Sequence, residues 1–240
     1  QLEKKKQSII AKENKEKNSG LHKIKEDLHL KLIPSHIECF DNSNLQGSAP
    51  VAACVVFKNG RPSKKDYRLF NIKTVVGPDD YKSMEEVIYR RYSRVLNENL
   101  PMPQLIIVDG GKGQLSSAMK SLKSLKLDGK VAVIGIAKRL EEIYFPNDST
   151  PLYLDKKSNS LRLIQQLRNE AHRFAINHHR KKRVSKAIGS SLEKIEGIGP
   201  KTTELLLKKF GSIKNLMSQK KSKIELLIGP SKTKKLFQKK

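Results

Sequence analysis

Two short runs of mainly apolar residues in this chain lead into an aspartate. Residues 105–108 read Leu-Ile-Ile-Val before Asp109, and residues 36–40 read His-Ile-Glu-Cys-Phe before Asp41. A continuous apolar run such as 105–108 is typical of a parallel strand that is buried on both faces. Ligands of open α/β folds bind where such strands end, at the carboxyl edge of the sheet. The sequence therefore predicts an α/β fold that presents carboxylates at that edge.

Turn signals and apolar spacing indicate the remaining elements. Asn59-Gly60 is a hairpin signal between a strongly apolar run at 51–57 and an alternating run at 66–74. Further strand-like segments lie at 131–137 and at 143–154, the latter a hairpin that turns at Asn147-Asp148. Strands of antiparallel character followed by a β-α-β pattern predict a mixed sheet flanked by helices.

Helices are expected at 77–96, 113–125 and 158–179. The first has an apolar stripe formed by Tyr81, Met84, Ile88 and Val95. Asp79 and Asp80 at its start read as an ordinary cap and first-turn acid, although a third acidic group near a metal is an equal alternative. Arg90, Arg91 and Arg94 on this helix either reach phosphate or form a solvated face.

The chain divides into segments of different composition. We expect a charged linker or helical segment with little to bury at 1–33, an α/β core domain at 34–180, a basic linker at 181–189 and a small all-α domain at 190–240. The net charge is +25, and residues 180–240 hold 18 Lys and Arg against 4 Glu, a net +14. Such an excess favours nucleic acid as a partner, although scattered lysines are also typical of a solvated surface.

Composition limits other classes of function. Cys39 and Cys54 lie in apolar runs without metal-ligand spacing and read as buried free thiols of a cytoplasmic protein. No apolar stretch reaches the length of a membrane span, so no membrane partner is expected. The chain begins at Gln1 within a lysine-rich stretch, which indicates a piece of a longer protein.

The aspartates suggest metal-dependent phosphodiester chemistry. Mg²⁺ and Mn²⁺ prefer oxygen ligands and are held by one or two carboxylates plus substrate phosphate. Asp41 and Asp109 can share such an ion only if their strands are neighbours. His172 lies one residue, about 100°, from the middle of the apolar stripe of the helix at 158–179. It is either a metal ligand or proton carrier, or a solvent-exposed histidine.

A glycine hairpin follows the core. Ile195-Glu196-Gly197-Ile198-Gly199-Pro200-Lys201 resembles the helix-hairpin-helix motif, in which backbone N–H groups grip a DNA phosphate independently of sequence. Gly197, Gly199 and Lys201 are its candidate DNA-binding residues. A less regular copy at 227–232 contains Gly229 and Lys232, and there a plain helical turn is the alternative.

Four separated motifs carry a resemblance to a known family. The motifs are ECFDNSNLQG, GPDDYKSMEEVIYRRY, IIVDGGKGQL and RNEAHRFAI, in this order. Together with the hairpins they resemble the C-terminal half of the UvrC family, the incision subunits of the bacterial UvrABC excision repair system. The resemblance covers roughly residues 34–240.

The resemblance implies an RNase H-like domain followed by tandem helix-hairpin-helix motifs, cutting on the 5′ side of a DNA lesion with Mg²⁺ or Mn²⁺. The catalytic and metal triad would be Asp41, Asp109 and His172, with Asp80 as an additional acidic position. Lys112, Arg168 and Arg173, which lie in or beside the same motifs, are expected to contact DNA. Partners would be double-stranded DNA with a lesion, and UvrB through a segment outside this chain.

Two departures and two alternatives accompany this interpretation. Asn44 stands where many family members carry histidine, and the second hairpin lacks the usual glycine pattern. A DNA-binding scaffold with an inactive core is one alternative, against which the intact triad argues. A related RNase H-like nuclease acting on RNA or deaminated DNA is the other, against which the hairpins and the motif set argue.

Overall fold

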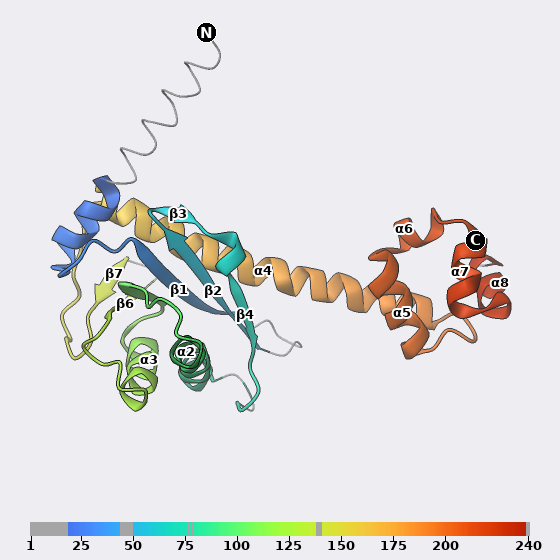
Figure 1. Cartoon of the computed structure of the whole chain (residues 1–240), viewed down its shortest axis with the longest axis horizontal. Coiled ribbons are helices and arrows are strands. Elements are labelled where there is room, and N and C mark those ends of the chain that lie inside the picture. Colours follow the sequence, from blue (N-terminus) through green and yellow to red (C-terminus); the bar gives the residue numbers. More distant parts are fainter. Residues whose placement is uncertain (1–18, 44–49, 76, 78, 138–140, 239–240) are drawn as a thin grey trace, which may run out of the picture. The chain divides into compact units, whose positions relative to one another are not determined.

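A computed structural model describes residues 19–43, 50–75, 77, 79–137 and 141–238, without the side chains of 179 and 181–190. Asn44, Gly47 in the loop expected after the first strand, and most of the expected N-terminal segment lie outside the described residues. The chain forms two compact units, 1–176 and 177–240 (Figure 1). The predicted division into four segments stays a prediction.

The first unit is built on a mixed sheet with strand order β3-β2-β1-β5-β6-β7, and β4 pairs with the same strand β2 as β3 does. β1, β5 and β6 are parallel, whereas β2 and β7 run antiparallel to their neighbours β1 and β6. The strands are β1 (His36–Ser43), β2 (Val51–Lys58), β3 (Arg61–Pro62), β4 (Arg68–Asn71), β5 (Leu105–Asp109), β6 (Ala132–Ala137) and β7 (Glu142–Tyr144). The predicted mixed α/β class is confirmed.

Helices cover both faces of this sheet. Figure 1 shows α2 (Asp80–Asn97) and α3 (Lys112–Ser124) on one side and α4 (Asn159–Glu193) along the other. All five residues of β5 are therefore buried, as the apolar run predicted. Asn59 and Gly60 both adopt positive φ, 51° and 70°, so the first hairpin turns where its dipeptide predicted.

The segment before β1 contributes to the core, contrary to our expectation that it buries little. Residues 19–27 form a helix, and Leu21, Ile24 and Leu28 are buried in the same apolar cluster as the sheet. Three apolar residues at spacings of three and four are enough to form one buried face. Lysines and glutamates around them hid this short stripe in the sequence.

Helix α2 differs from the prediction at one residue of its apolar stripe. Met84, Ile88 and Val95 are buried, but Tyr81 is 57% exposed. Tyr81 lies in the first turn of α2, where its ring meets the backbone of Gly113 in α3 instead of the sheet. Asp79 is the N-cap, and its side chain accepts hydrogen bonds from the backbone N–H groups of Tyr81 and Lys82.

A buried ion pair attaches α2 to the central strand β1. The side chain of Glu38 is fully buried, and it accepts hydrogen bonds from the Arg91 guanidinium and from the Tyr92 hydroxyl, the latter at 3.0 Å. Burial alone would raise the pKa of Glu38, but the His36 ring, 3.3 Å away, and the hydrogen-bonded Arg91 guanidinium lower it to about 2. Arg91 is therefore part of a buried ion pair. It neither reaches phosphate nor belongs to a solvated face, the two roles that the sequence suggested.

The arginines flanking Arg91 are also paired within the protein. Arg90 contacts Glu86 at 2.7 Å, and Arg94 contacts Glu98 at 2.7 Å, each one helical turn apart. Arg94 and Glu98 are both about half exposed, so they correspond to the solvated alternative.

The second unit is a small bundle of α5 (Pro200–Phe210), α6 (Ile213–Met217), α7 (Lys221–Ile228) and α8 (Pro230–Gln238), entered by the end of α4. Its two hairpins share the pattern Gly-Pro-x-x-Thr-x-x-Leu at 199–206 and 229–236. Both threonines and both leucines are buried, which supports an internal repeat. The copies differ in their turns. Residues 194–199 connect α4 to α5, whereas a single residue, Gly229, connects α7 to α8.

Helix α4 is longer than the predicted 158–179 and continues to Glu193. Between 180 and 188 the sequence contains lysine, arginine and alanine but no glycine or proline, so nothing interrupts the helix. The basic segment 181–189 is therefore helical.

We predict that Glu38→Ala lowers the free energy of unfolding by about 3–5 kcal/mol, because it leaves the Arg91 charge buried and unpaired. Urea denaturation at neutral pH measures this. Glu98→Ala, which breaks the exposed pair with Arg94 at the end of α2, is the matched control. It should lower the free energy of unfolding only a little.

Acid titration tests the same pair. The folded pKa of Glu38 lies below its ordinary value of 4.5, so its stabilisation is present above about pH 4.5 and is lost as the pH falls toward 2. Wild-type protein should therefore lose more stability than Glu38→Gln between these pH values. Equal losses would contradict the assignment.

Candidate metal centre

The parallel pairing of β1 with β5 places the two predicted aspartates side by side. Phe40 pairs with Val108 in this register, and Asp41 and Asp109 are the next residues of their strands. Both aspartates are buried, with 1% and 4% exposure. The condition that the two strands be neighbours is thus met, and the sheet holds both carboxylates at one edge.

Helix α4 adds the predicted histidine to this edge. His172 Nδ1 lies 2.9 Å from Asp41 Oδ2, and its side chain is 48% exposed. Its neighbour Ala171 is fully buried, so His172 occupies the flank beside the apolar stripe. An ionised carboxylate can only accept, so Nδ1 carries the proton of this hydrogen bond and Nε2 of a neutral ring retains its lone pair.

Asp41, Asp109 and His172 form a group that can hold a divalent metal ion. One ligand atom from each residue lies within 4.8 Å of the others. Two carboxylates and one imidazole are ligands that Mg²⁺, Mn²⁺ and related ions accept. Two adjacent buried carboxylates also carry like charges, which a cation would compensate. The residues therefore fit a divalent metal ion, and their catalytic roles stay predictions.

The charge of this edge acts on a neighbouring thiol. Cys39 is fully buried, and burial raises its pKa, which the carboxylates of Asp109 and Asp41 raise further. The thiol is therefore neutral at physiological pH and is a poor metal ligand. Cys39 and Cys54 are buried free thiols, as predicted.

Asp80 lies close to the edge but outside the group of three. It is the first residue of α2, and its backbone carbonyl accepts a hydrogen bond of 2.8 Å from Asn42 Nδ2. Asn42 follows Asp41, so this bond fixes the beginning of α2 beside the end of the site strand. A role for the Asp80 carboxylate stays a prediction.

The predicted DNA contacts of α4 have partners within the protein. Arg168 lies 3.4 Å from Glu141, and Glu141 also accepts a hydrogen bond from Gln165. Glu141 has a positive φ of 56° and was not expected as their partner, because a glutamate between two strands gives no spacing signal. Arg173 pairs with Glu170 on the surface at 2.7 Å. His179 lies on α4, but its side chain is not among those described.

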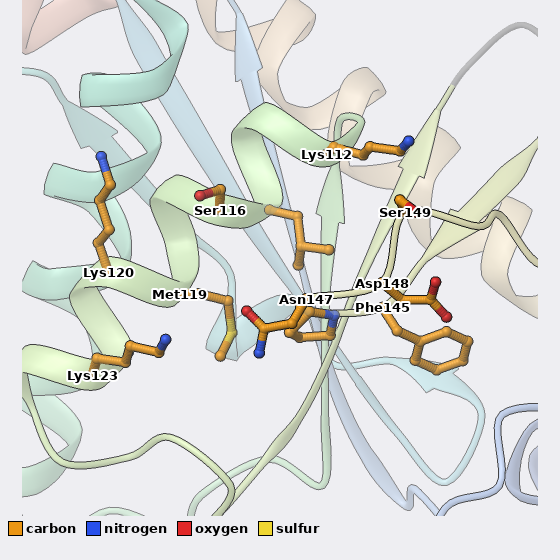
Figure 2. A pocket seen from close by; sticks show the side chains of 11 residues that line it. Lys112, Ser116, Met119, Lys120, Lys123, Phe145, Asn147, Asp148 and Ser149 are labelled. Carbon is orange, nitrogen blue, oxygen red and sulfur yellow. The ribbon is translucent and has the colours of Figure 1, made fainter.

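Two open grooves flank the start of α3. One of about 350 Å³ lies between α3 and the hairpin at 145–149, and Lys112, Lys120 and Lys123 line its α3 side. Figure 2 shows Lys123 extending toward Asn147. The other, of about 620 Å³, lies between the first turns of α2 and α3. Lys112 borders both grooves, and its ammonium lies 5.1 Å from the centre of the Tyr144 ring.

In the helical unit the candidate DNA-binding residues lie at the two turns. Gly197 has a φ of 84°, and Gly199 is the N-cap of α5. Lys201 is exposed in the first turn of α5. Lys232, at the start of α8, donates a hydrogen bond of 3.2 Å to Thr202 Oγ1, which joins the two hairpins to each other.

This sheet and its flanking helices define an RNase H-like nuclease fold, and its carboxylate-histidine edge can hold a divalent metal ion. Within that class, the sequence identifies one family. It matches the UvrC RNase H endonuclease domain over residues 25–176, more than half of the chain, so the chain belongs to this family. Within the described residues no helix is long and apolar enough to span a bilayer.

Curated relatives agree over nearly the whole chain. It is 61% identical to UvrABC system protein C of Flavobacterium psychrophilum over 235 residues, which are 98% of this chain and 39% of that protein. It is 58% identical to the protein of the same name from Porphyromonas gingivalis over 218 residues, 91% of this chain and 36% of the relative. The chain thus spans less than half the length of these relatives.

A solved structure shows a more distant similarity. Endonuclease V of Ciona intestinalis, in complex with DNA containing an inosine, is 20% identical with a TM-score of 0.34. The similarity covers 68% of this chain and 69% of that one.

We predict that Mn²⁺ binds at this edge and that Asp109→Asn weakens it by tenfold or more, because one of two anionic ligands is lost. Isothermal titration calorimetry on the 240-residue chain measures this. His172→Ala should also weaken Mn²⁺ binding if the imidazole completes the site. His22→Ala, at an exposed histidine on the helix of residues 19–27, is its matched control and should bind Mn²⁺ as wild type does. Equal Mn²⁺ affinity in wild type and Asp109→Asn would exclude the site.

Proposed function

We propose that this chain is a divalent-metal-dependent DNA endonuclease module that makes the 5′ incision beside a lesion in nucleotide excision repair. The observation that carries the proposal is the meeting of Asp41, Asp109 and His172 at one sheet edge within a UvrC endonuclease domain. These residues come from three elements separated by more than 60 residues each, so their convergence depends on the whole fold.

In the proposed reaction the two buried aspartates hold one Mg²⁺ or Mn²⁺ ion. Such an ion, when bound, orients a phosphate, offsets developing charge and activates water. Asp41 also orients the imidazole through its hydrogen bond to Nδ1. His172 is half exposed, so it can meet the substrate and either complete the metal shell or move a proton at Nε2. Asp80 adds negative charge beside this edge.

The helical unit supplies affinity in this proposal. The backbone around Gly197 and Gly199 would contact a duplex phosphate, and Lys201 would add charge. The second turn, with Gly229 and Lys232, would contribute less, because Lys232 already contacts Thr202. Lys112, Arg168 and Arg173 would contact DNA near the metal. Phosphate contacts position the protein on the duplex and leave sequence unread.

The partners follow from the relatives' names. These proteins are named UvrABC system protein C, which supports a role with the UvrABC system and DNA. We propose lesion-containing duplex as the substrate and contact with UvrB through a segment outside this chain, in the bacterial cytoplasm. A scaffold with an inactive core is disfavoured by the compact site. An RNA substrate is disfavoured by the helical unit, and deaminated DNA is disfavoured by the match to the UvrC family.

We predict that Asp41→Ala and Asp109→Ala abolish the 5′ cut while DNA affinity changes little. The carboxylates hold the ion, whereas most binding energy comes from basic residues elsewhere. The measurement is single-turnover cleavage of lesion-containing duplex by the full-length protein with UvrB, together with a binding titration. Cutting at near wild-type rate by either variant would refute the metal assignment.

The same assay includes a metal control. Mg²⁺ or Mn²⁺ should support cutting and Ca²⁺ should not, because Ca²⁺ adopts looser, higher coordination. Activity that persists in excess chelator would remove the metal from the mechanism.

We predict separately that Lys201→Gln lowers the slope of log affinity against log salt by about 0.9, the value for one phosphate contact on duplex DNA. Lys214→Gln, on α6 of the same unit and away from both turns, is the matched control. Removal of residues 189–240 should lower the slope further. An unchanged slope after this truncation would reduce the unit to a solubilising surface.

A further inference from the structure

Tyr81 is an aromatic residue whose exposure the fold does not explain. The other members of its predicted stripe are buried, but Tyr81 is 57% exposed at the first turn of α2. A Cβ placed on Gly113 would lie 2.4 Å from its ring, so the ring passes directly over the α3 backbone. One side of the ring is thereby supported by the protein, and much of its surface remains open to solvent.

The exposed ring lines the larger groove beside the metal edge. Asp79, Asp80 and Tyr81 form the α2 wall of this groove, and residues 111–114 form the α3 wall. The α3 wall begins two residues after Asp109, and the α2 wall is joined to the end of β1 by the hydrogen bond from Asn42 to Asp80. Both walls are therefore connected to the metal-binding strands by short segments.

Charge differs between the two walls. Asp79 and Asp80 are anionic and repel a phosphate, whereas Lys112 on the opposite wall attracts one. A nucleotide in this groove would therefore turn its phosphate toward α3 and its uncharged base toward α2. The only aromatic surface that the groove's lining residues offer to a base is Tyr81.

We propose that Tyr81 is a stacking platform for one DNA base beside the cleaved phosphate, with Gly113 providing the space for its ring. The proposal rests on the endonuclease function above and adds a nucleotide-positioning residue to it. Stacking suits an enzyme that accepts many sequences, because every base has a π-face. Tyr81 would thus help to place the strand without reading its sequence.

The alternative is that Tyr81 merely packs α2 against α3. Gly113→Ala separates these roles, because it displaces the ring without removing it. Alanine normally stabilises a helix relative to glycine, so its folding cost at this position should be small or favourable. A packing role predicts a loss of stability with unchanged DNA contact, and a stacking role predicts a loss of DNA contact without a loss of stability.

The experiment is photo-crosslinking of the 240-residue chain to DNA that carries 5-iodouracil at one position at a time. The probe is a duplex with a short unpaired bubble, and Ca²⁺ replaces Mg²⁺ so that the probe stays uncut. The variants are Tyr81→Ala, Tyr81→Phe and Gly113→Ala. Tyr89→Ala, at a 49%-exposed tyrosine further along α2, is the matched control. Thermal melting monitors folding.

We expect a crosslinked peptide containing Tyr81 at one or two adjacent probe positions. Tyr81→Ala and Gly113→Ala should weaken binding to the bubble by about 5- to 150-fold, the range for one stacked base, with melting temperatures near wild type. Tyr81→Phe and Tyr89→Ala should bind as wild type does.

Absence of a Tyr81 crosslink at every position, or an equal loss in Tyr81→Ala and Tyr89→Ala, would overturn the proposal. A Tyr81 crosslink together with unimpaired cutting by Asp41→Ala would instead refute the metal mechanism and leave the stacking role intact. The two proposals can therefore fail separately.

Discussion

The candidate site depends on one structural relationship, the parallel pairing of β1 with β5. This pairing sets Phe40 opposite Val108 and thereby brings Asp41 and Asp109 together just beyond the last paired residues of β1 and β5. A shift of the register by one residue would turn one carboxylate to the opposite face of the sheet. The buried apolar residues of both strands therefore fix the register that the carboxylates require, although they take no part in the chemistry.

Contacts of β1 also position helix α2 beside Asp41 and Asp109. The Glu38–Arg91 ion pair ties α2 to β1 from within, and Asn42 ties the beginning of α2 to the end of the same strand. A buried ion pair is a costly way to gain stability, but it tolerates few alternative arrangements. The ion pair therefore helps to hold the first turn of α2, with Asp80 and Tyr81, beside the sheet edge that carries Asp41 and Asp109.

The sequence predicted most of the sheet, because apolar runs and the Asn59-Gly60 turn are local signals. It also supplied the three residues that converge, but their proximity depended on strand order, and the family resemblance brought them together. Arg91, Glu141 and Tyr81 show what local patterns miss. The Arg91 partner is 53 residues away, the partners of Glu141 lie on helix α4, and the ring of Tyr81 lies over a glycine in α3.

In the proposed function, charge explains why affinity and chemistry belong to different parts of this chain. Two adjacent buried carboxylates create a negative edge, and that edge repels a phosphate unless a cation is present. In the proposed function the affinity must therefore arise elsewhere, and residues 180–240 carry 18 of the 49 lysines and arginines. A grip on phosphates that ignores sequence leaves the choice of the cut site to partners. Cleavage then requires a bound metal ion and a strand delivered to it, so a basic surface alone cannot cause indiscriminate cutting.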